Sequence, residues 1–284
     1  MISAPTGLIE VNGQPAVQLR APDGAAATVL LHGAHIVSWV PAGSEEQLYL
    51  SPATRYGEGH AVRGGVPVCF PQFSDRGPLP KHGFARTRAW AFDQAQVRGE
   101  HAFAVLRLVD DAATRALWPF AFAAELTISV SGGRLDIELA VTNTGDATLE
   151  FTAALHTYLH SFNVLKTQLE GLQGATYYDH VAGVDGKQQW IDVLTVAQEM
   201  DRIYWQAPQP LLLREPGRRV EITTEGFEDT VVWNPGPQKC ALLVDMPPEG
   251  WRDMLCVEAA QIGAPVRLAP GQEWAGMQTL ISRV

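Results

Sequence analysis

The sequence has few cysteines, and their spacing matches no common cysteine motif. Its 284 residues include only Cys69, Cys240 and Cys256, with no Cys-x-x-Cys pair among them. An odd, dispersed set excludes a disulfide framework and a zinc knuckle. We therefore expect three buried free thiols in a reducing compartment, which predicts a cytoplasmic location.

Long apolar runs and an excess of positive charge are also missing. No apolar stretch approaches the roughly 18 residues of a membrane span, and the first ten residues lack the basic region and apolar run of a secretory signal. The net charge of −10 argues against nucleic acid or an anionic membrane as the main partner, because both select basic surfaces. We expect neither partner, and the sequence does not predict an oligomeric state.

The motifs of many enzyme classes are absent as well. There is no P-loop, no G-x-G-x-x-G after a strand, no G-x-S-x-G and no H-E-x-x-H. His156 and His160 have the spacing of a zinc pair on a helix, but the residues before them alternate like a strand, which would separate the two side chains. We expect no metal and no cofactor.

What the chain does have is strand periodicity. Apolar and polar residues alternate from Phe122 to Val130 and again from Leu135 to Val141, with Ser131–Gly133 as a turn between them. This pattern is typical of a β-hairpin. A further strand is predicted over Leu149–His156, and the segment from Val266 to Ile281 has the pattern of another hairpin, with its turn at Ala269–Gly271.

Helical patterns are scarce, with a short helix over Asp111–Leu117 as the main candidate. We see no repeat, linker or low-complexity tract. The sequence therefore predicts one domain over residues 1–284, of the all-β class, built as a large antiparallel β-sandwich whose long loops carry the functional site.

One segment combines basic residues with Gly, Pro and Phe. It runs from Arg63 to Phe73 (RGGVPVCFPQF) and continues through Gly77–Arg86 (GPLPKHGFAR). With Arg88, the residues Arg63, Lys81 and Arg86 form a basic cluster in an otherwise acidic protein. Arginine presents a fork of donors suited to phosphate or carboxylate, so we expect this loop to bind an anionic small molecule.

Four segments supply acid–base candidates, namely the basic loop with His82, the strand end at His156, the stretch around Asp201, and Glu258. Glu258 follows the apolar Leu255–Val257, and a glutamate is rarely buried without a partner or a task. His32 and His35 are predicted to be structural. An acid–base set beside an anion site suits proton transfer on a phosphorylated small molecule.

These residues resemble the hexose-6-phosphate mutarotases of the aldose 1-epimerase superfamily. The resemblance rests first on the long basic motif. Shorter matches, in the same order along the chain, are Asp111–Pro119 (DAATRALWP), Ala154–Tyr158 (ALHTY), Thr230–Pro235 (TVVWNP), Cys256–Glu258 (CVE) and Leu268–Trp274 (LAPGQEW).

The resemblance implies a galactose mutarotase-like supersandwich and interconversion of the anomers of a hexose 6-phosphate. It implies that His156 and Glu258 are the catalytic acid and base. Arg63 and Arg86 match the phosphate contacts of the family, and His82 and Asp201 its other substrate-binding groups. Lys81 stands where relatives commonly have Gln, and it adds a positive charge beside the phosphate contacts.

Other interpretations remain open at this point. The chain could act on unphosphorylated aldoses, although the arginines argue against it. It could be a non-catalytic module that binds sugar phosphates. Glu258 and Asp201 could also be the paired carboxylates of a glycoside hydrolase, which would need them about 5–5.5 Å apart in a retaining enzyme.

Overall fold

The computed structural model describes residues 6–283 of the chain, and their regular structure is almost entirely β-strand. Every pairing between the named strands in this range is antiparallel, for example β8 with β9 and β19 with β20. The predicted all-β class is therefore confirmed. The first ten residues, in which no secretory signal is expected, lie partly outside the described range.

The largest sheet has nine strands. In spatial order they are β15 (Leu194–Thr195), β12 (Gln168–Glu170), β17 (Leu211–Glu215), β18 (Arg218–Glu225), β21 (Glu273–Arg283), β9 (Arg134–Asn143), β8 (Phe122–Ser131), β7 (His101–Val109) and β6 (Ala91–Arg98).

A second sheet has eight strands and carries most of the site. Its order is β14 (Val184–Gln188), β13 (Thr176–Asp179), β16 (Met200–Tyr204), β19 (Asp229–Asn234), β20 (Met254–Leu268), β10 (Leu149–Leu155) and β5 (Val68–Cys69), with β11 (Tyr158–His160) paired to β20 beside this path.

A third sheet of four strands and a few short helices complete the fold. The sheet contains β1 (Gly7–Val11), β2 (Gln14–Arg20), β3 (Ala26–Leu30) and β4 (His35–Val40). The α-helices are α1 (Ala112–Leu117) and α2 (Gly236–Cys240), and the 3-10 helices are Ala85–Thr87, Val164–Lys166 and Gly250–Asp253.

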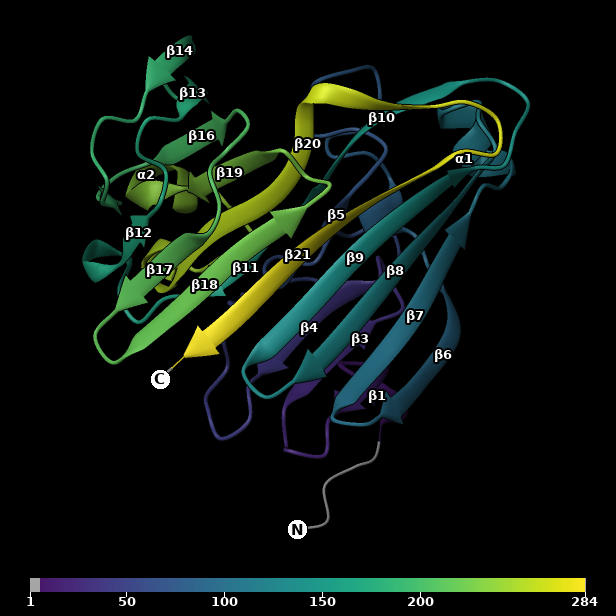
Figure 1. Ribbon diagram of the computed structural model, residues 1–284, viewed down its shortest axis with the longest axis horizontal. Coiled ribbons are helices and arrows are strands. Elements are labelled where there is room, and N and C mark those ends of the chain that lie inside the picture. Colours follow the sequence, from purple (N-terminus) through teal and green to yellow (C-terminus); the bar gives the residue numbers. More distant parts are fainter. Residues whose placement is uncertain (1–5, 284) are drawn as a thin grey trace.

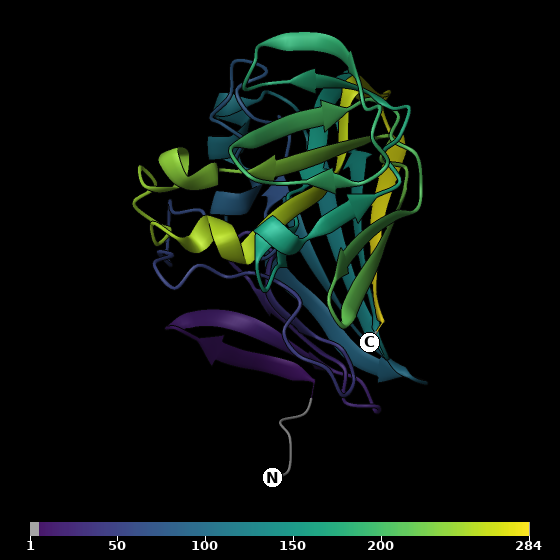
Figure 2. The same cartoon turned by 90° about the vertical axis from the view of Figure 1, so that its left-hand side faces the viewer.

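The sheets pack as layers of a sandwich, as predicted. The nine-stranded sheet forms one broad layer, and the eight-stranded and four-stranded sheets lie on the same side of it (Figures 1 and 2). One hydrophobic cluster joins all three, including Trp39 from β4, Leu126 from β8 and Val257 from β20. The core therefore lies between the layers, and the outer side of the eight-stranded sheet is left for a site.

The local predictions for the middle of the chain are confirmed. The hairpin β8–β9 turns at Gly132–Gly133 with Ser131 opposite Arg134, and β8 alternates buried and half-buried residues along its whole length. The predicted helix is α1, and Asp111 caps it by accepting a hydrogen bond from the Thr114 amide.

The C-terminal hairpin prediction is wrong. The turn is present, since the Gln272 amide donates to Ala269 O, but the strands on its two sides join different sheets. Strand β20 pairs with β10 and β19, whereas β21 pairs with β9 and β18. The reason is that both strands carry an apolar face toward the core, so the turn links two layers instead of two neighbours in one sheet.

The cysteines are buried and free, as predicted. His35 is also structural, because its ring lies fully buried with Nε2 2.7 Å from Gly64 O, and burial lowers its pKa to about 4. In residues 6–283 no helix has the length and apolar character needed to cross a membrane.

Candidate active site

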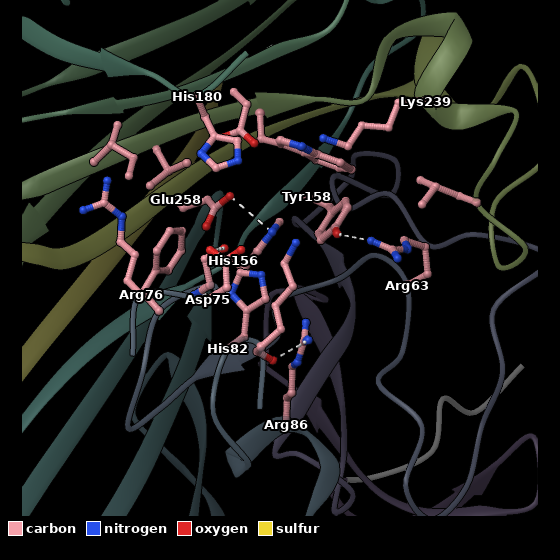
Figure 3. Close-up of a pocket in the computed structure, with 18 residues that line it drawn as sticks. Arg63, Asp75, Arg76, His82, Arg86, His156, Tyr158, His180, Lys239 and Glu258 are labelled. Carbon is pink, nitrogen blue, oxygen red and sulfur yellow. Dashed lines mark hydrogen bonds and ion pairs between the residues drawn. The ribbon is translucent and has the colours of Figure 1, made fainter. Parts of the chain in front are cut away.

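The predicted site residues come together in one cavity of about 220 Å³ on the eight-stranded sheet (Figure 3). They arrive from loops and strands that are far apart in the sequence. All seven line its wall: Arg63, Lys81, His82, Arg86, His156, Asp201 and Glu258. Arg88 does not, since its guanidinium lies 3.8 Å from Asp111 at the start of α1.

His156 and Glu258 form a buried pair at the floor of the cavity. His156 is the first residue after β10, and its amide donates to Pro67 O. Its ring stacks on Tyr158 at 4.8 Å between centroids. Glu258 lies on β20 opposite Val231. The distance between His156 Nε2 and Glu258 Oε1 is 3.3 Å, with only 10% and 1% of the side chains exposed.

Burial controls the protonation of this pair. It lowers the pKa of His156 well below the usual value, and the cations of Arg86, Arg63 and Lys81 lower it further. Burial raises the pKa of Glu258 well above the usual value, and the carboxylate of Asp201 adds to this effect. Burial therefore disfavours the charged form of both groups, the imidazolium of His156 and the carboxylate of Glu258.

One ring nitrogen and one carboxyl oxygen of the pair lack a protein partner. His156 Nδ1 and Glu258 Oε2 are buried without a hydrogen bond to the protein, and buried polar atoms normally have one. Asp201, half-buried on β16, contributes a second carboxyl and lies opposite Trp233 of β19. Burial raises its pKa as well. The floor thus offers several polar groups to a molecule rich in hydroxyls.

The loop that carries His82 is held rigidly. The His82 amide donates to Ser74 O and so closes the loop. The Gln72 side-chain amide donates to Ser74 O and Leu79 O, and its oxygen accepts from the Leu79 amide. The next residue must be glycine, because a Cβ at Gly83 would lie 2.1 Å from Phe70 O.

The three basic residues predicted to hold an anion, Arg63, Lys81 and Arg86, all line the cavity. Arg63 donates to the Tyr158 hydroxyl at 3.0 Å and lies 3.1 Å from Asp245. Arg86 donates to Lys81 O at 3.0 Å, and within the described chain no carboxylate pairs with Arg86 or Lys81. Gly64 allows this packing, since a Cβ there would lie 2.3 Å from Tyr49 O. Two unpaired cations beside a paired one can accept an anion.

Comparison with known proteins identifies the family. A model of the family described as aldose 1-epimerase matches residues 15–280. The chain belongs to the aldose 1-epimerase family. The resemblance seen in the motifs is thus confirmed, and this is a family of isomerases.

Individual relatives agree with this membership. A Cenchrus ciliaris protein named "Putative glucose-6-phosphate 1-epimerase" is 31% identical over 286 residues, covering 97% of this chain and 85% of the relative. An Escherichia coli protein of the same name is 32% identical over 238 residues, 82% and 79% of the two chains. The crystal structure of a Salmonella typhimurium protein described as a "putative mutarotase" superposes with a TM-score of 0.90 at 28% identity, over 99% and 95% of the chains. The mutarotase-like fold is therefore also confirmed.

The sequence analysis did not predict several residues that line the cavity of this member of the aldose 1-epimerase family. Lys239, on α2, reaches the cavity and bonds Glu199 at 2.7 Å. Arg76 lies at the other end of the cavity in Figure 3, over the ring of Tyr178 at 5.2 Å. His180 also lines the wall. Each is a lone polar residue, on the short helix α2 or in an irregular segment, so no pattern in the sequence sets it apart.

One trio has the geometry of a metal site. Ligand atoms of His156, Cys256 and Glu258 lie within 4.8 Å of one another. Binding would require the Cys256 thiolate, yet burial raises the pKa of that thiol well above its usual value. The nearby cations would also repel a metal ion. Two members of this trio, His156 and Glu258, also form the buried pair described above.

Proposed function

We propose that this chain interconverts the α and β anomers of a hexose 6-phosphate by opening and closing the sugar ring. The observation that carries the proposal is the buried His156–Glu258 pair, 3.3 Å apart, in a cavity that the cations of Arg63, Lys81 and Arg86 also line. The pair supplies proton transfer, and the cations supply a place for the phosphate.

Ring opening needs two proton transfers. One proton goes to the ring oxygen and another leaves the C1 hydroxyl. The C1–C2 bond then rotates, and the ring closes on the other face of C1 as both protons return. His156 is the donor to the ring oxygen and Glu258 the acceptor from the hydroxyl, with the roles exchanged on closure. Each positioned transfer contributes roughly 10²–10⁴ in rate.

The phosphate prepares this pair for reaction. In the empty cavity the proton lies on Glu258, because burial favours neutral groups. Arg63, Arg86 and Lys81 all lower the pKa of His156, whereas only Arg86 among them lowers that of Glu258. A bound phosphate, with about −1.5 to −2 charges, offsets these cations. It should therefore raise the pKa of His156 more than that of Glu258. Transfer of the proton from Glu258 to His156 across the 3.3 Å contact would give the imidazolium and carboxylate that ring opening uses.

The remaining polar groups hold the sugar. Asp201 accepts hydrogen bonds from ring hydroxyls, and His82 lies beside His156 with 5.5 Å between the ring centroids. Trp233 and Phe73 supply apolar walls, which suit the C–H faces of a pyranose. Neither a metal nor a cofactor enters this scheme.

Exchange NMR on equilibrated sugars tests the proposal. The rate of anomer exchange is measured with and without protein for glucose 6-phosphate, mannose 6-phosphate, galactose 6-phosphate and free glucose. We expect acceleration for one or more of the phosphates and little for glucose. Equal acceleration of glucose would indicate an epimerase of free aldoses, and no acceleration of any sugar would leave a binding module.

A further inference from the structure

A buried thiol that the proposed chemistry does not use lies directly behind His82. Cys69 Sγ is 3.1 Å from His82 Nδ1, and the two residues are 0% and 7% exposed. The backbone fixes the thiol, because Cys69 ends β5 and lies opposite Ala154 of β10. His156 follows Ala154 by two residues, so the same strand pair places both histidines.

A second contact decides which nitrogen of His82 carries the proton. The Ser74 amide donates to His82 Nδ1 at 3.3 Å, and a backbone N–H cannot accept a hydrogen bond. Nδ1 must therefore be the unprotonated nitrogen, and a neutral ring then has its hydrogen on Nε2. The thiol can donate its S–H to the same Nδ1.

The surroundings keep both groups in the required state. Burial raises the pKa of the Cys69 thiol, so it remains a donor. Burial also lowers the pKa of His82, as do His156, Arg86, Lys81 and Arg63 around it, so its ring remains neutral. His82 is moreover held at φ 65°, in the left-handed region that only a few per cent of non-glycine residues adopt. Such strain at a cavity wall is typical of a side chain aimed for function.

We propose that Cys69 is a positioning residue which, together with the Ser74 amide, holds His82 as the Nε2–H tautomer and so presents a fixed hydrogen-bond donor to an oxygen of the bound sugar. The nature of that oxygen rests on the proposed function. A neutral donor stabilises negative charge that develops on oxygen during ring opening, and it does not compete with His156 for the transferred proton.

Histidine ring ¹⁵N NMR tests the tautomer without any substrate. We expect the His82 Nδ1 resonance of the wild type to have the shift of an unprotonated nitrogen and not to titrate between about pH 5.5 and 8.5, since an ordinary histidine titrates near 6.5. In C69A only the Ser74 amide still donates to Nδ1, so the Nδ1 resonance should shift toward that of an unprotonated nitrogen with weaker hydrogen bonding, and in C69S, which keeps a donor, it should stay near the wild type. A protonated Nδ1 in the wild type, or an unchanged shift in C69A, would overturn the proposal.

Kinetics provide the second measurement. C69A should lower kcat on the order of 10-fold, the usual effect of losing a supporting partner, with a smaller change in KM, and C69S should recover most of it. C240A is the matched control, because it removes another buried thiol, which bonds Pro247 O, and should leave kcat unchanged. Wild-type kcat in folded C69A would also contradict the proposal. If no sugar is turned over at all, the proposed function fails, while the ¹⁵N result still decides the tautomer.

Discussion

Strands β8 and β20 use their two faces in different ways. Along β8, buried and half-buried residues alternate without exception, because one face packs in the core and the other meets solvent. Along β20, every residue from Met254 to Ile262 is buried. One of its faces packs in the core, and the other closes the floor of the cavity, where Glu258 lies.

The difference separates stability from function. On β8 the buried residues are apolar, and burial stabilises the sheet. On β20 the Glu258 carboxyl is buried away from water, which disfavours its charged form, and its pKa rises as a result. A group placed at a disadvantage in this way contributes to reaction chemistry more than to folding. The predictions below test this contrast, beginning with the largest expected effect.

Glu258→Gln should abolish most of the turnover while the fold is kept. Losing one proton-transfer group should lower kcat about 10²–10⁴-fold. Anomer exchange on glucose 6-phosphate measures this loss. Glu138→Gln is the matched control, since Glu138 lies exposed on β9. Near-normal turnover in Glu258→Gln would remove Glu258 from the mechanism.

The same variant should be more stable than the wild type at neutral pH. A carboxyl whose pKa is raised on folding binds its proton more tightly in the folded state. The unfolded chain loses that proton first as the pH rises through about 4.5, so stability falls above this pH. Gln does not titrate, so thermal unfolding at pH 4 and pH 7 should show a smaller decline in the variant. An equal decline in both would contradict the assigned pKa direction.

On the other strand, Ile128→Ala should lower the free energy of unfolding by about 2–5 kcal/mol, because Ile128 is fully buried in β8. Its kcat should match that of the wild type. Thr127→Ala, on the half-buried face, should change stability by less than about 0.5 kcal/mol. Denaturant unfolding measures both, and a loss of kcat in folded Ile128→Ala would show that β8 and the cavity are coupled.

Arg86→Ala should weaken the binding of sugar phosphate about 10- to 100-fold, the equivalent of one charged hydrogen bond. Arg63→Ala should also weaken it, since Arg63 lines the same cavity, although Asp245 already pairs with it. Binding of free glucose should change little in either. Arg107→Ala, on the solvent side of β7 with Glu125, is the control. Equal losses for glucose and its phosphate would mean that these arginines support only the shape of the site.

The smallest effect is a shift in one pKa. Inorganic phosphate should raise the pKa of His156, because an anion bound in the cavity offsets the cations that lower it. NMR titration with and without phosphate measures this, and His101, exposed on β7, serves as the internal reference. A pKa of His156 that stays unchanged at saturating phosphate would argue against the proposed proton transfer.

Sequence patterns were informative where one rule governs a segment. The alternation of apolar and polar residues predicted β8 and β9 to within a residue or two, because one face of each strand packs in the core and the other faces solvent. The buried stretch before Glu258 and the dense basic motif marked the site, and the motifs marked the family. A cytoplasmic location, a single domain and the roles of the site residues remain predictions.

Other features depend on contacts that no local pattern encodes. The turn after Leu268 has ordinary turn residues, yet it links two sheets, because the layer that β21 joins is set by β9 and β18. Lys239 on α2 and Arg76 in its loop reach the cavity only through the tertiary fold. The lowered pKa of His156 and the raised pKa of Glu258 likewise follow from three-dimensional burial, which spacing in the sequence does not reveal.

The central claim is that the basic residues of the cavity select a sugar phosphate for the buried pair. The most direct measurement is the ratio of kcat/KM for glucose 6-phosphate to that for glucose, by exchange NMR, in the wild type and in an Arg63→Ala/Arg86→Ala double variant. The account predicts a ratio far above one in the wild type that falls toward one in the variant. A ratio near one in the wild type, or one that survives the double substitution, would contradict it.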